Sequence, residues 1–237
     1  MLIKFFKDPQ WRKEFIEGKF YMNTVGILQQ YFENSKQYDV YEGTQLLLRT
    51  TGETHWSLTP NDKGEIYYVE KEGMPSDNQF VAEVAFSRKA ESEKKLFCMY
   101  TLWGDSSKKE IMKIDPSLIK DFGEYAVVIV NTPLFLVRVQ EKAQTIRSRM
   151  NSEPVYDFVN YLHKENLPSK TPIGLYKKIQ TDSMLQDEFR ICFDMKDIIG
   201  VYKDFEVEVS DICTPIEAEK LINMSALNVT GLKFGRL

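Results

Sequence analysis

The sequence is poor in the residues that mark common catalytic centres. Its 237 residues include two histidines and three cysteines. His55 and His163 lie far apart, and neither has cysteine or acidic neighbours at metal-ligand spacing, so we expect no zinc site and no Cys–His nucleophile pair. The chain has no GxSxG, Walker or GxGxxG motif either, so nucleophile-elbow and phosphate-cradling chemistry have no sequence support.

The cysteines are odd in number and form no CxxC pair. Cys98 and Cys192 lie in apolar runs, which predicts buried free thiols in a reducing compartment. The chain has no signal-peptide pattern at its start and no apolar run near the ~20 residues of a membrane span. We therefore expect a cytoplasmic protein with no membrane partner.

No charge of one sign dominates: the formal net charge is -4 and the sequence pI is about 5.4. Such a chain has no overall field that favours nucleic acid or an anionic membrane. Aromatic residues, in contrast, reach 13%, enough to fill a sizeable core or a binding interface.

Residue patterns predict a mixed chain that is richer in strands than in helices. We expect a strand over residues 1–6, then a helix with Asp8 as N-cap, Pro9 at its first position and Gly18 after its end. Trp11 and Phe15 are four residues apart and should face the core together. A second short helix is expected to begin near residue 23.

Later segments extend this pattern. Four β-rich runs separated by turn signals predict an antiparallel meander: TQLLLRT, EIYYVE, FVAEVAF and KLFCMYT. Further strands are expected at 125–130 (a central one), DEFRICFD, FEVEVS and ALNVTGLKF, and further helices from Thr132, over 152–167, and from a Thr214–Glu217 capping box. We expect an α+β fold: one domain over 1–237, with a mostly antiparallel twisted sheet flanked by about five helices.

The segment from Gly18 to Gly43 combines many aromatic rings with polar groups. Its candidate binding residues are Tyr21, Asn23, Asp39, Tyr41 and Glu42. Asp39 and Glu42 could meet in a turn and hold a hard cation, or Asp39 could cap backbone amides in a purely structural turn. A nuclease that uses these two carboxylates is a further alternative, although it lacks a nearby lysine; overall the sequence predicts no metal site.

A second polar cluster lies at Gln186, Asp187, Glu188 and Arg190. Because side chains alternate along a strand, Gln186, Glu188 and Arg190 should share one face. Glu188 and Arg190 could pair with each other, or they could line a cleft together with Gln186. The Gln-x-Glu triplet resembles the strand motif of ADP-ribosyltransferases, and that resemblance implies a glutamate that binds a ribose hydroxyl of NAD.

Several motifs in chain order resemble a family of uncharacterised proteins from bacteria and their phages. They are YMNT at 21–24, YF at 31–32, DxYEG at 39–43, FCMY at 97–100, FGEYAVVI at 122–129 and QDEFRI at 186–191. The resemblance implies a shared fold and suggests a role in phage–host conflict.

Two functional hypotheses follow. In the first, the protein binds a host or defence protein through exposed aromatic residues, with Trp56 and Trp103 as further candidates, and needs no cofactor. In the second, it is an ADP-ribosyltransferase-like or other nucleotide-handling enzyme in which Glu188, Gln186 and Arg190 act on NAD. Homo-oligomerisation stays open. Both hypotheses assume that the segment from Gly18 to Gly43 and the cluster from Gln186 to Arg190 line one shared hollow.

Overall fold

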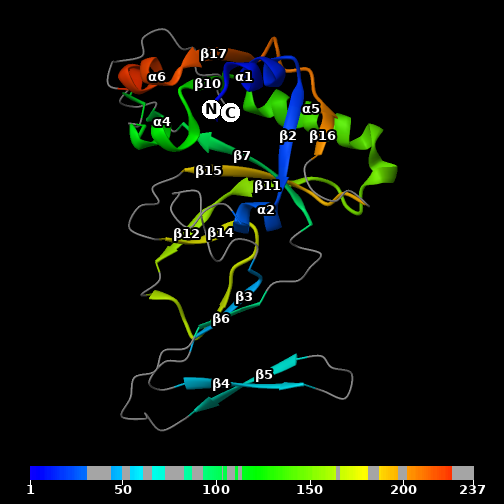
Figure 1. Cartoon of the computed structure of the whole chain (residues 1–237), viewed down its shortest axis with the longest axis vertical. Coiled ribbons are helices and arrows are strands. Elements are labelled where there is room, and N and C mark those ends of the chain that lie inside the picture. Colours follow the sequence, from blue (N-terminus) through cyan, green and yellow to red (C-terminus); the bar gives the residue numbers. More distant parts are fainter. Residues whose placement is uncertain are drawn as a thin grey trace.

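A computed structural model gives the arrangement of the chain in space (Figure 1). It describes residues 1–30, 44–49, 54–60, 66–72, 83–86, 93–102, 104–105, 110–111, 114–163, 166–180, 187–196 and 202–225. Within these residues, mixed helices and predominantly antiparallel strands confirm the expected α+β class.

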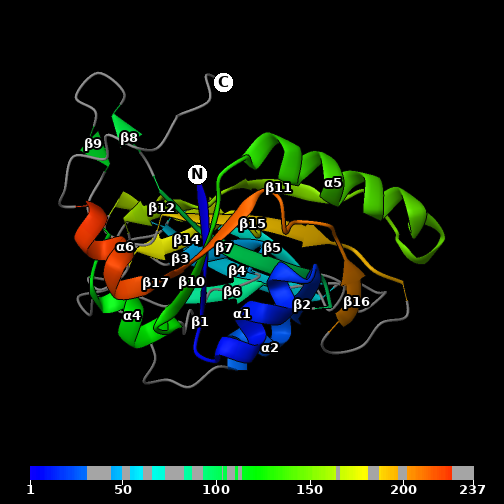
Figure 2. The same cartoon turned by 90° about the horizontal axis from the view of Figure 1, so that it is seen from above.

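The main sheet has eight strands, which come from both ends of the chain and from its middle. These are β1 (Leu2–Phe6), β2 (Lys19–Thr24), β7 (Lys95–Thr101), β10 (Tyr125–Ile129), β11 (Val155–Phe158), β15 (Glu188–Phe193), β16 (Tyr202–Glu206) and β17 (Cys213–Glu217). The strand order is β11-β15-β7-β1-β10-β17, while β2 pairs with β7 and β16, and every pair is antiparallel (Figure 2). β10 has a partner on each side, which confirms it as a central strand.

The sheet forks at β7. β15 pairs along the whole of β7, so β1 and β2 must share the other edge: β1 pairs at Thr101 and β2 pairs at Leu96. The connection between β1 and β2 is helix α1 (Pro9–Ile16). As predicted, the Asp8 side chain caps α1 by accepting a hydrogen bond from the Gln10 amide at 2.7 Å, and Gly18 follows with a positive φ of 93°.

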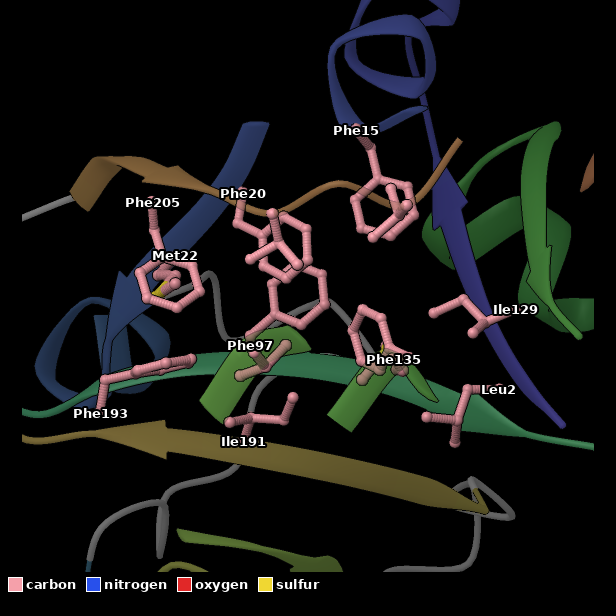
Figure 3. Close-up of a cluster of buried hydrophobic side chains, with 14 of the residues drawn as sticks. Leu2, Phe15, Phe20, Met22, Phe97, Ile129, Phe135, Ile191, Phe193 and Phe205 are labelled. Atoms are coloured by element: carbon pink, nitrogen blue, oxygen red, sulfur yellow. The ribbon is translucent and has the colours of Figure 1, made fainter. Parts of the chain in front are cut away.

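One face of the sheet carries the largest apolar cluster, which is rich in phenylalanine. Phe15 from α1, Phe135 from α5 (Thr132–Thr145) and Phe97 from β7 all contribute, and Phe20 stacks on Phe97 with ring centroids 4.6 Å apart (Figure 3). The stacked and edge-on rings fill this space without polar atoms, which places the centre of the core above the fork.

The opposite face is divided between two smaller clusters. At the β1–β10–β17 end, Leu118 of α4 (Ser117–Phe122) and Leu221 of α6 (Ala218–Ser225) cover Ile3 and Val128. At the β7–β15 end, a separate cluster contains Val25 of α2 (Val25–Gln30), Leu96 and Cys192. Glu188 and Arg190 lie on this second face, between the two clusters. Glu188 pairs with Tyr100 of β7, and Arg190 pairs with Cys98.

Smaller strand groups complete the described fold. They are β12 (Asn160–His163) with β14 (Lys177–Gln180), β13 (Lys170–Pro172) with β3 (Leu46–Arg49) and β6 (Glu83–Phe86), β4 (Thr54–Pro60) with β5 (Ile66–Glu72), and β8 (Gly104–Asp105) with β9 (Glu110–Ile111). A single 3-10 turn, η1 (Arg147–Arg149), follows α5. In Figure 1 the β4–β5 hairpin lies at the end of the molecule opposite α1, α4 and α6.

Several expected elements are wrong. Within the helix expected over 152–167, residues 155–158 form β11 and residues 160–163 form β12. The free edge of β15 offers backbone partners to β11, which is rich in Val, Tyr and Phe. The Thr214–Glu217 capping box is the strand β17, which pairs with β10; Pro215 is tolerated there because β17 is an edge strand.

Connectivity and orientation also differ from expectation. The four β-rich runs form no simple meander, because β3 pairs with β6 and encloses the β4–β5 hairpin between them. Trp11 is 58% exposed and does not join Phe15 in the core. Asn23 belongs to the strand β2, and the helix begins two residues later. The strand expected at 226–234 lies outside the described residues.

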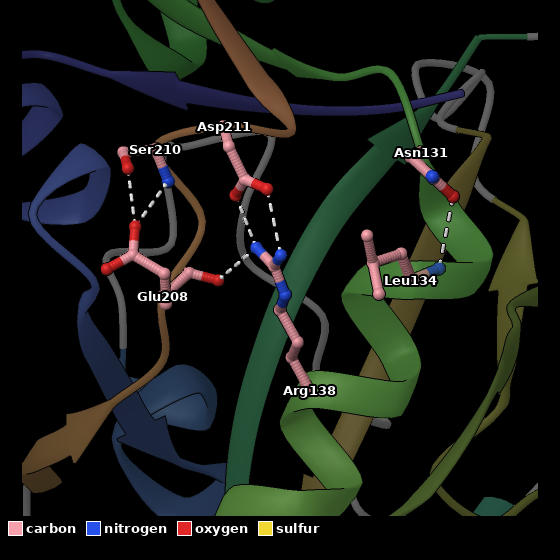
Figure 4. A network of polar contacts seen from close by, with 6 residues as sticks. All are labelled: Asn131, Leu134, Arg138, Glu208, Ser210 and Asp211. Carbon is pink, nitrogen blue, oxygen red and sulfur yellow. Dashed lines mark hydrogen bonds and ion pairs between the residues drawn. The ribbon is translucent and has the colours of Figure 1, made fainter.

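One basic residue of α5, Arg138, is bonded to another segment of the protein. Arg138 forms a two-pronged ion pair with Asp211 and donates a hydrogen bond to the Glu208 carbonyl at 2.9 Å (Figure 4). At the start of the same helix, Asn131 caps the Leu134 amide at 3.1 Å. Arg138 therefore holds α5 against the 208–211 turn.

Candidate functional site

The structure describes only some of the residues that the sequence singled out. Glu188, Arg190, Tyr21 and Asn23 are described with their side chains, and Trp56 is described as a backbone position in β4. Outside the described residues lie Gln186, Asp39, Tyr41, Glu42 and Trp103. The Asp39–Glu42 side of the predicted shared hollow therefore lies outside the described residues.

Glu188 is buried, and its carboxylate is bonded to two positively charged side chains. One carboxylate oxygen, Oε1, accepts a hydrogen bond from Arg190 Nε at 2.7 Å, and the other lies 2.9 Å from Lys178 Nζ. Arg190 is 1% exposed and also donates to the Leu175 carbonyl at 2.6 Å. Of the two alternatives open from the sequence, Glu188 and Arg190 therefore do pair with each other.

The charge state of this cluster follows from its partners. Burial alone would raise the pKa of the Glu188 carboxyl, but the charges of Arg190 and Lys178 and their hydrogen bonds outweigh it and hold that pKa well below its usual range. Glu188 is therefore an ionised carboxylate throughout the physiological range. A proton carrier needs a pKa near the working pH, so this environment does not suit Glu188 for acid–base work.

Two members of the cluster were not found by sequence reasoning. Lys178 and Tyr161 lie side by side in the parallel β12–β14 pair, which brings Lys178 to Glu188. The Tyr161 hydroxyl is buried and has no hydrogen-bond partner, and burial, followed by the charge of Glu188, strongly raises its pKa. No local pattern marks either residue, because their position depends on a parallel pairing between segments that are separate in sequence.

Lys4 occupies the fork in the sheet. It is a residue of β1, and its Nζ reaches β7, where it donates to the Cys98 carbonyl at 2.6 Å and lies 4.6 Å from the centre of the Phe97 ring. Burial lowers the pKa of Lys4, and the nearby Cys98 and Glu188 partly oppose that change. Lys4 thus supplies the hydrogen bond that a neighbouring strand would otherwise give to this carbonyl.

The N-terminal corner presents a different surface. Along β2, Phe20 and Met22 face the core while Tyr21, between them, is 50% exposed. The Tyr21 ring stacks on Trp11 of α1, with centroids 6.5 Å apart and planes at 8°. Asn23 is half-buried, and its side-chain oxygen is buried without a hydrogen-bond partner.

These two regions differ in what they can do. The Glu188 cluster is internal and its charges are engaged with one another, which is the arrangement of a structural ion-pair network. The Trp11–Tyr21 pair is exposed, and its two stacked rings come from α1 and β2. Within the described ranges, no three His, Cys, Asp or Glu residues come together to hold a metal ion. No helix in the described part of the chain is both long and apolar enough to cross a membrane.

Comparison with known proteins adds no assignment. The resemblance to uncharacterised bacterial and phage proteins stays a prediction from the motifs. No family model, no curated protein and no solved structure matches this chain.

Proposed function

We propose that the protein works by binding another protein through the exposed aromatic pair Trp11–Tyr21, as a phage or mobile-element factor that engages a host or defence protein. The exposure of this stacked pair is the observation that carries the binding part of the proposal. The setting in phage–host conflict rests on the motif resemblance given above.

The pair has the properties of an interface anchor. Trp11 is 58% exposed and Tyr21 is 50% exposed, and the two rings stack on each other. Trp11 is on a helix fastened by the Asp8 cap and by the buried Phe15, and Tyr21 is on a strand paired with β16. Trp and Tyr dominate binding energy at interfaces, and rings that are already ordered lose little entropy on binding.

The same segment also provides a polar rim. Glu17 lies 3.8 Å from Lys13 Nζ and 3.5 Å from Lys19 Nζ in exposed ion pairs. An apolar centre beside exposed charges is the usual composition of a protein–protein contact surface.

The burial of Glu188 favours binding over the enzyme hypothesis. A ribose hydroxyl of NAD would have to reach a carboxylate that is 8% exposed and already bonded to Arg190 at 2.7 Å and Lys178 at 2.9 Å. Displacing either partner would leave a buried charge unpaired, and breaking a buried pair in this way costs about 3–5 kcal/mol. NAD turnover by wild type against Glu188→Gln is the direct measurement for the enzyme alternative, which predicts loss of turnover in the variant.

A crosslinking experiment tests the binding proposal. A photoreactive phenylalanine analogue replaces Trp11, the protein is irradiated in a lysate of the host, and the crosslinked protein is identified and purified. Its affinity for wild type is then compared with that for the double variant Trp11→Ala/Tyr21→Ala and for Val137→Ala, an exposed apolar residue on α5. We expect at least a tenfold loss in the double variant and no change in Val137→Ala. Equal affinity for all three proteins would refute the proposal.

A further inference from the structure

The edge strand β11 has an unusual composition for an exposed position. It is the terminal strand in the order of the main sheet, with β15 on one side. Val155 is 55% exposed, Tyr156 41% and Phe158 45%. Exposed sheet edges in natural proteins are commonly protected by charged side chains, proline or a bulge; β11 has one charged residue, Asp157, no proline, and a regular register with β15.

Hydrogen-bond alternation shows which backbone groups point outward. The Val159 amide donates to the Glu188 carbonyl at 2.8 Å, so Val159 is in a bonded pair with β15. In an antiparallel ladder bonded residues alternate, so Val155 and Asp157 also direct their amides and carbonyls to β15, while Tyr156 directs its own to the outer edge. The Phe158 amide agrees with this alternation, since it donates to the Asp157 side chain at 2.8 Å.

The aromatic face of the sheet continues to this edge. Tyr156 and Phe158 flank the buried Phe189, with centroid distances of 6.1 Å and 5.2 Å. A strand that pairs with β11 would therefore meet rings on the core face and Val155 with Asp157 on the other face.

We propose that a second copy of this chain pairs with β11 through its own β11, antiparallel, about a two-fold axis at Tyr156. Each Tyr156 amide donates to the Tyr156 carbonyl of the other copy, and the two main sheets become one continuous sheet. The two tyrosine rings form a cross-strand aromatic pair on the core face, and Val155 of each copy lies opposite Asp157 of the other. Such an interface is isologous, so it closes at a dimer.

Charge and side-chain direction select this register. A two-fold axis at Asp157 would place like charges directly opposite each other, which is destabilising. A slip of one residue between the copies would set side chains of one face against those of the other, so it cannot replace the Tyr156 register. A second copy of the chain brings its own Tyr156 opposite this Tyr156, so the ring pair needs no other sequence. β11 is separated from β2 by β15 and β7, so the dimer is independent of the Trp11–Tyr21 proposal and leaves that surface in place.

A disulfide scan tests this register. Bonded residue pairs across an antiparallel ladder have Cα atoms about 5.5 Å apart, within the range of about 4.4–6.8 Å that a disulfide spans. Tyr156→Cys should therefore form a covalent dimer on mild oxidation, seen on a non-reducing gel. Asp157→Cys is the matched control: the two substituted positions would be offset from each other by two residues along the strands and lie beyond about 7 Å, so little dimer is expected.

The native cysteines should interfere little. Burial, as the main cause, raises the pKa of Cys98 to about 12 and that of Cys213 to about 11, and Cys192 is buried, so all three thiols react slowly. Wild type under the same oxidation measures the remaining background.

A second variant tests the dimer without oxidation. Light scattering should show a concentration-dependent dimer for wild type and at least a tenfold weaker one for Tyr156→Lys, which places a charge on the edge. Far-ultraviolet circular dichroism should show both to be folded. The proposal is overturned if wild type stays monomeric up to its solubility limit, if Tyr156→Lys dimerises equally well, or if Asp157→Cys crosslinks as readily as Tyr156→Cys. If wild type is monomeric, a strand from another protein remains as the candidate for pairing with the outer edge of β11.

Discussion

At the residue scale, a side chain's chemistry depends on where the fold places it. Glu188 and Arg190 have the residue types of a catalytic pair, but both are buried and bonded to each other, with Lys178 as a third member. Tyr21 is a bulky ring of the kind that usually fills a core, yet it is half-exposed and stacked on Trp11. Burial separates a structural network from a candidate recognition surface.

Removal of the buried carboxylate charge should lower the free energy of unfolding. Glu188→Gln leaves Arg190 and Lys178 without their counter-charge in the interior, so we expect a loss of about 3–5 kcal/mol in the free energy of unfolding, measured with urea. Glu17→Gln is the matched control, because Glu17 also meets two lysines, Lys13 and Lys19, but at the surface. There we expect little change, since exposed pairs contribute about 0–1 kcal/mol. Similar losses in both variants would contradict the role given to burial.

The same carboxylate should make stability depend on acid. The folded pKa of Glu188 is lowered from its ordinary value of 4.5, so its contribution is fully present above that pH and is lost as the pH falls below it. Between pH 6 and 3, we therefore expect the free energy of unfolding to fall less steeply in Glu188→Gln than in wild type. Parallel pH profiles for the two proteins would show that Glu188 is not responsible.

At the element scale, a tight backbone approach holds the α1–β2 junction against the residue that follows β16. Gly18 links α1 to β2 with φ 93°, and a Cβ at this position would lie 2.4 Å from the Val207 carbonyl oxygen. The Val207 amide in turn donates to the Gly18 carbonyl at 2.8 Å. Only glycine allows both the left-handed backbone and this contact.

Two glycine substitutions separate these effects. Gly18→Ala combines a left-handed backbone with a clash, whereas Gly174→Ala, at φ 74°, meets no atom within 4 Å. The backbone cost alone is about 1–2 kcal/mol in each case. We expect thermal unfolding to show a clearly larger drop in melting temperature for Gly18→Ala. Equal drops would mean that the chain near Val207 moves aside without cost.

At the scale of the whole molecule, the β4–β5 hairpin is an appendage inserted between β3 and β6. Figure 1 shows it at the far end from the helices around the main sheet. In the described register, Arg49 lies directly opposite Glu83, so the chain could cross there in a tight turn.

Deletion of residues 50–82, with Asn-Gly joining Arg49 to Glu83, should leave the main sheet folded, because an Asn-Gly turn closes an antiparallel pair. Circular dichroism and urea unfolding would check this, and loss of cooperative unfolding would contradict it. The deletion also removes Trp56. If Trp11 and Tyr21 carry binding, the affinity for the crosslinked partner should be unchanged, and a large loss would instead assign the contact to the hairpin.

The sequence by itself determined the elements that depend on near neighbours. The Asp8–Pro9 helix start, the apolar strand at 125–129, and the division of β15 into Phe189, Ile191 and Phe193 on one face and Glu188 with Arg190 on the other all follow from short-range sterics and alternation. The α+β class follows from the same patterns. These features need no knowledge of distant partners.

Tertiary structure alone decided the rest. Residues 155–158 and 213–217 carry helix-like spacing or capping signals, yet they became strands because β15 and β10 had open edges whose backbone groups required partners. Lys178 and Tyr161 reached Glu188 through a parallel pairing, and Trp11 turned outward although Phe15 turned in. Burial of polar groups and completion of sheet edges are long-range conditions, so local patterns do not determine which segment meets them.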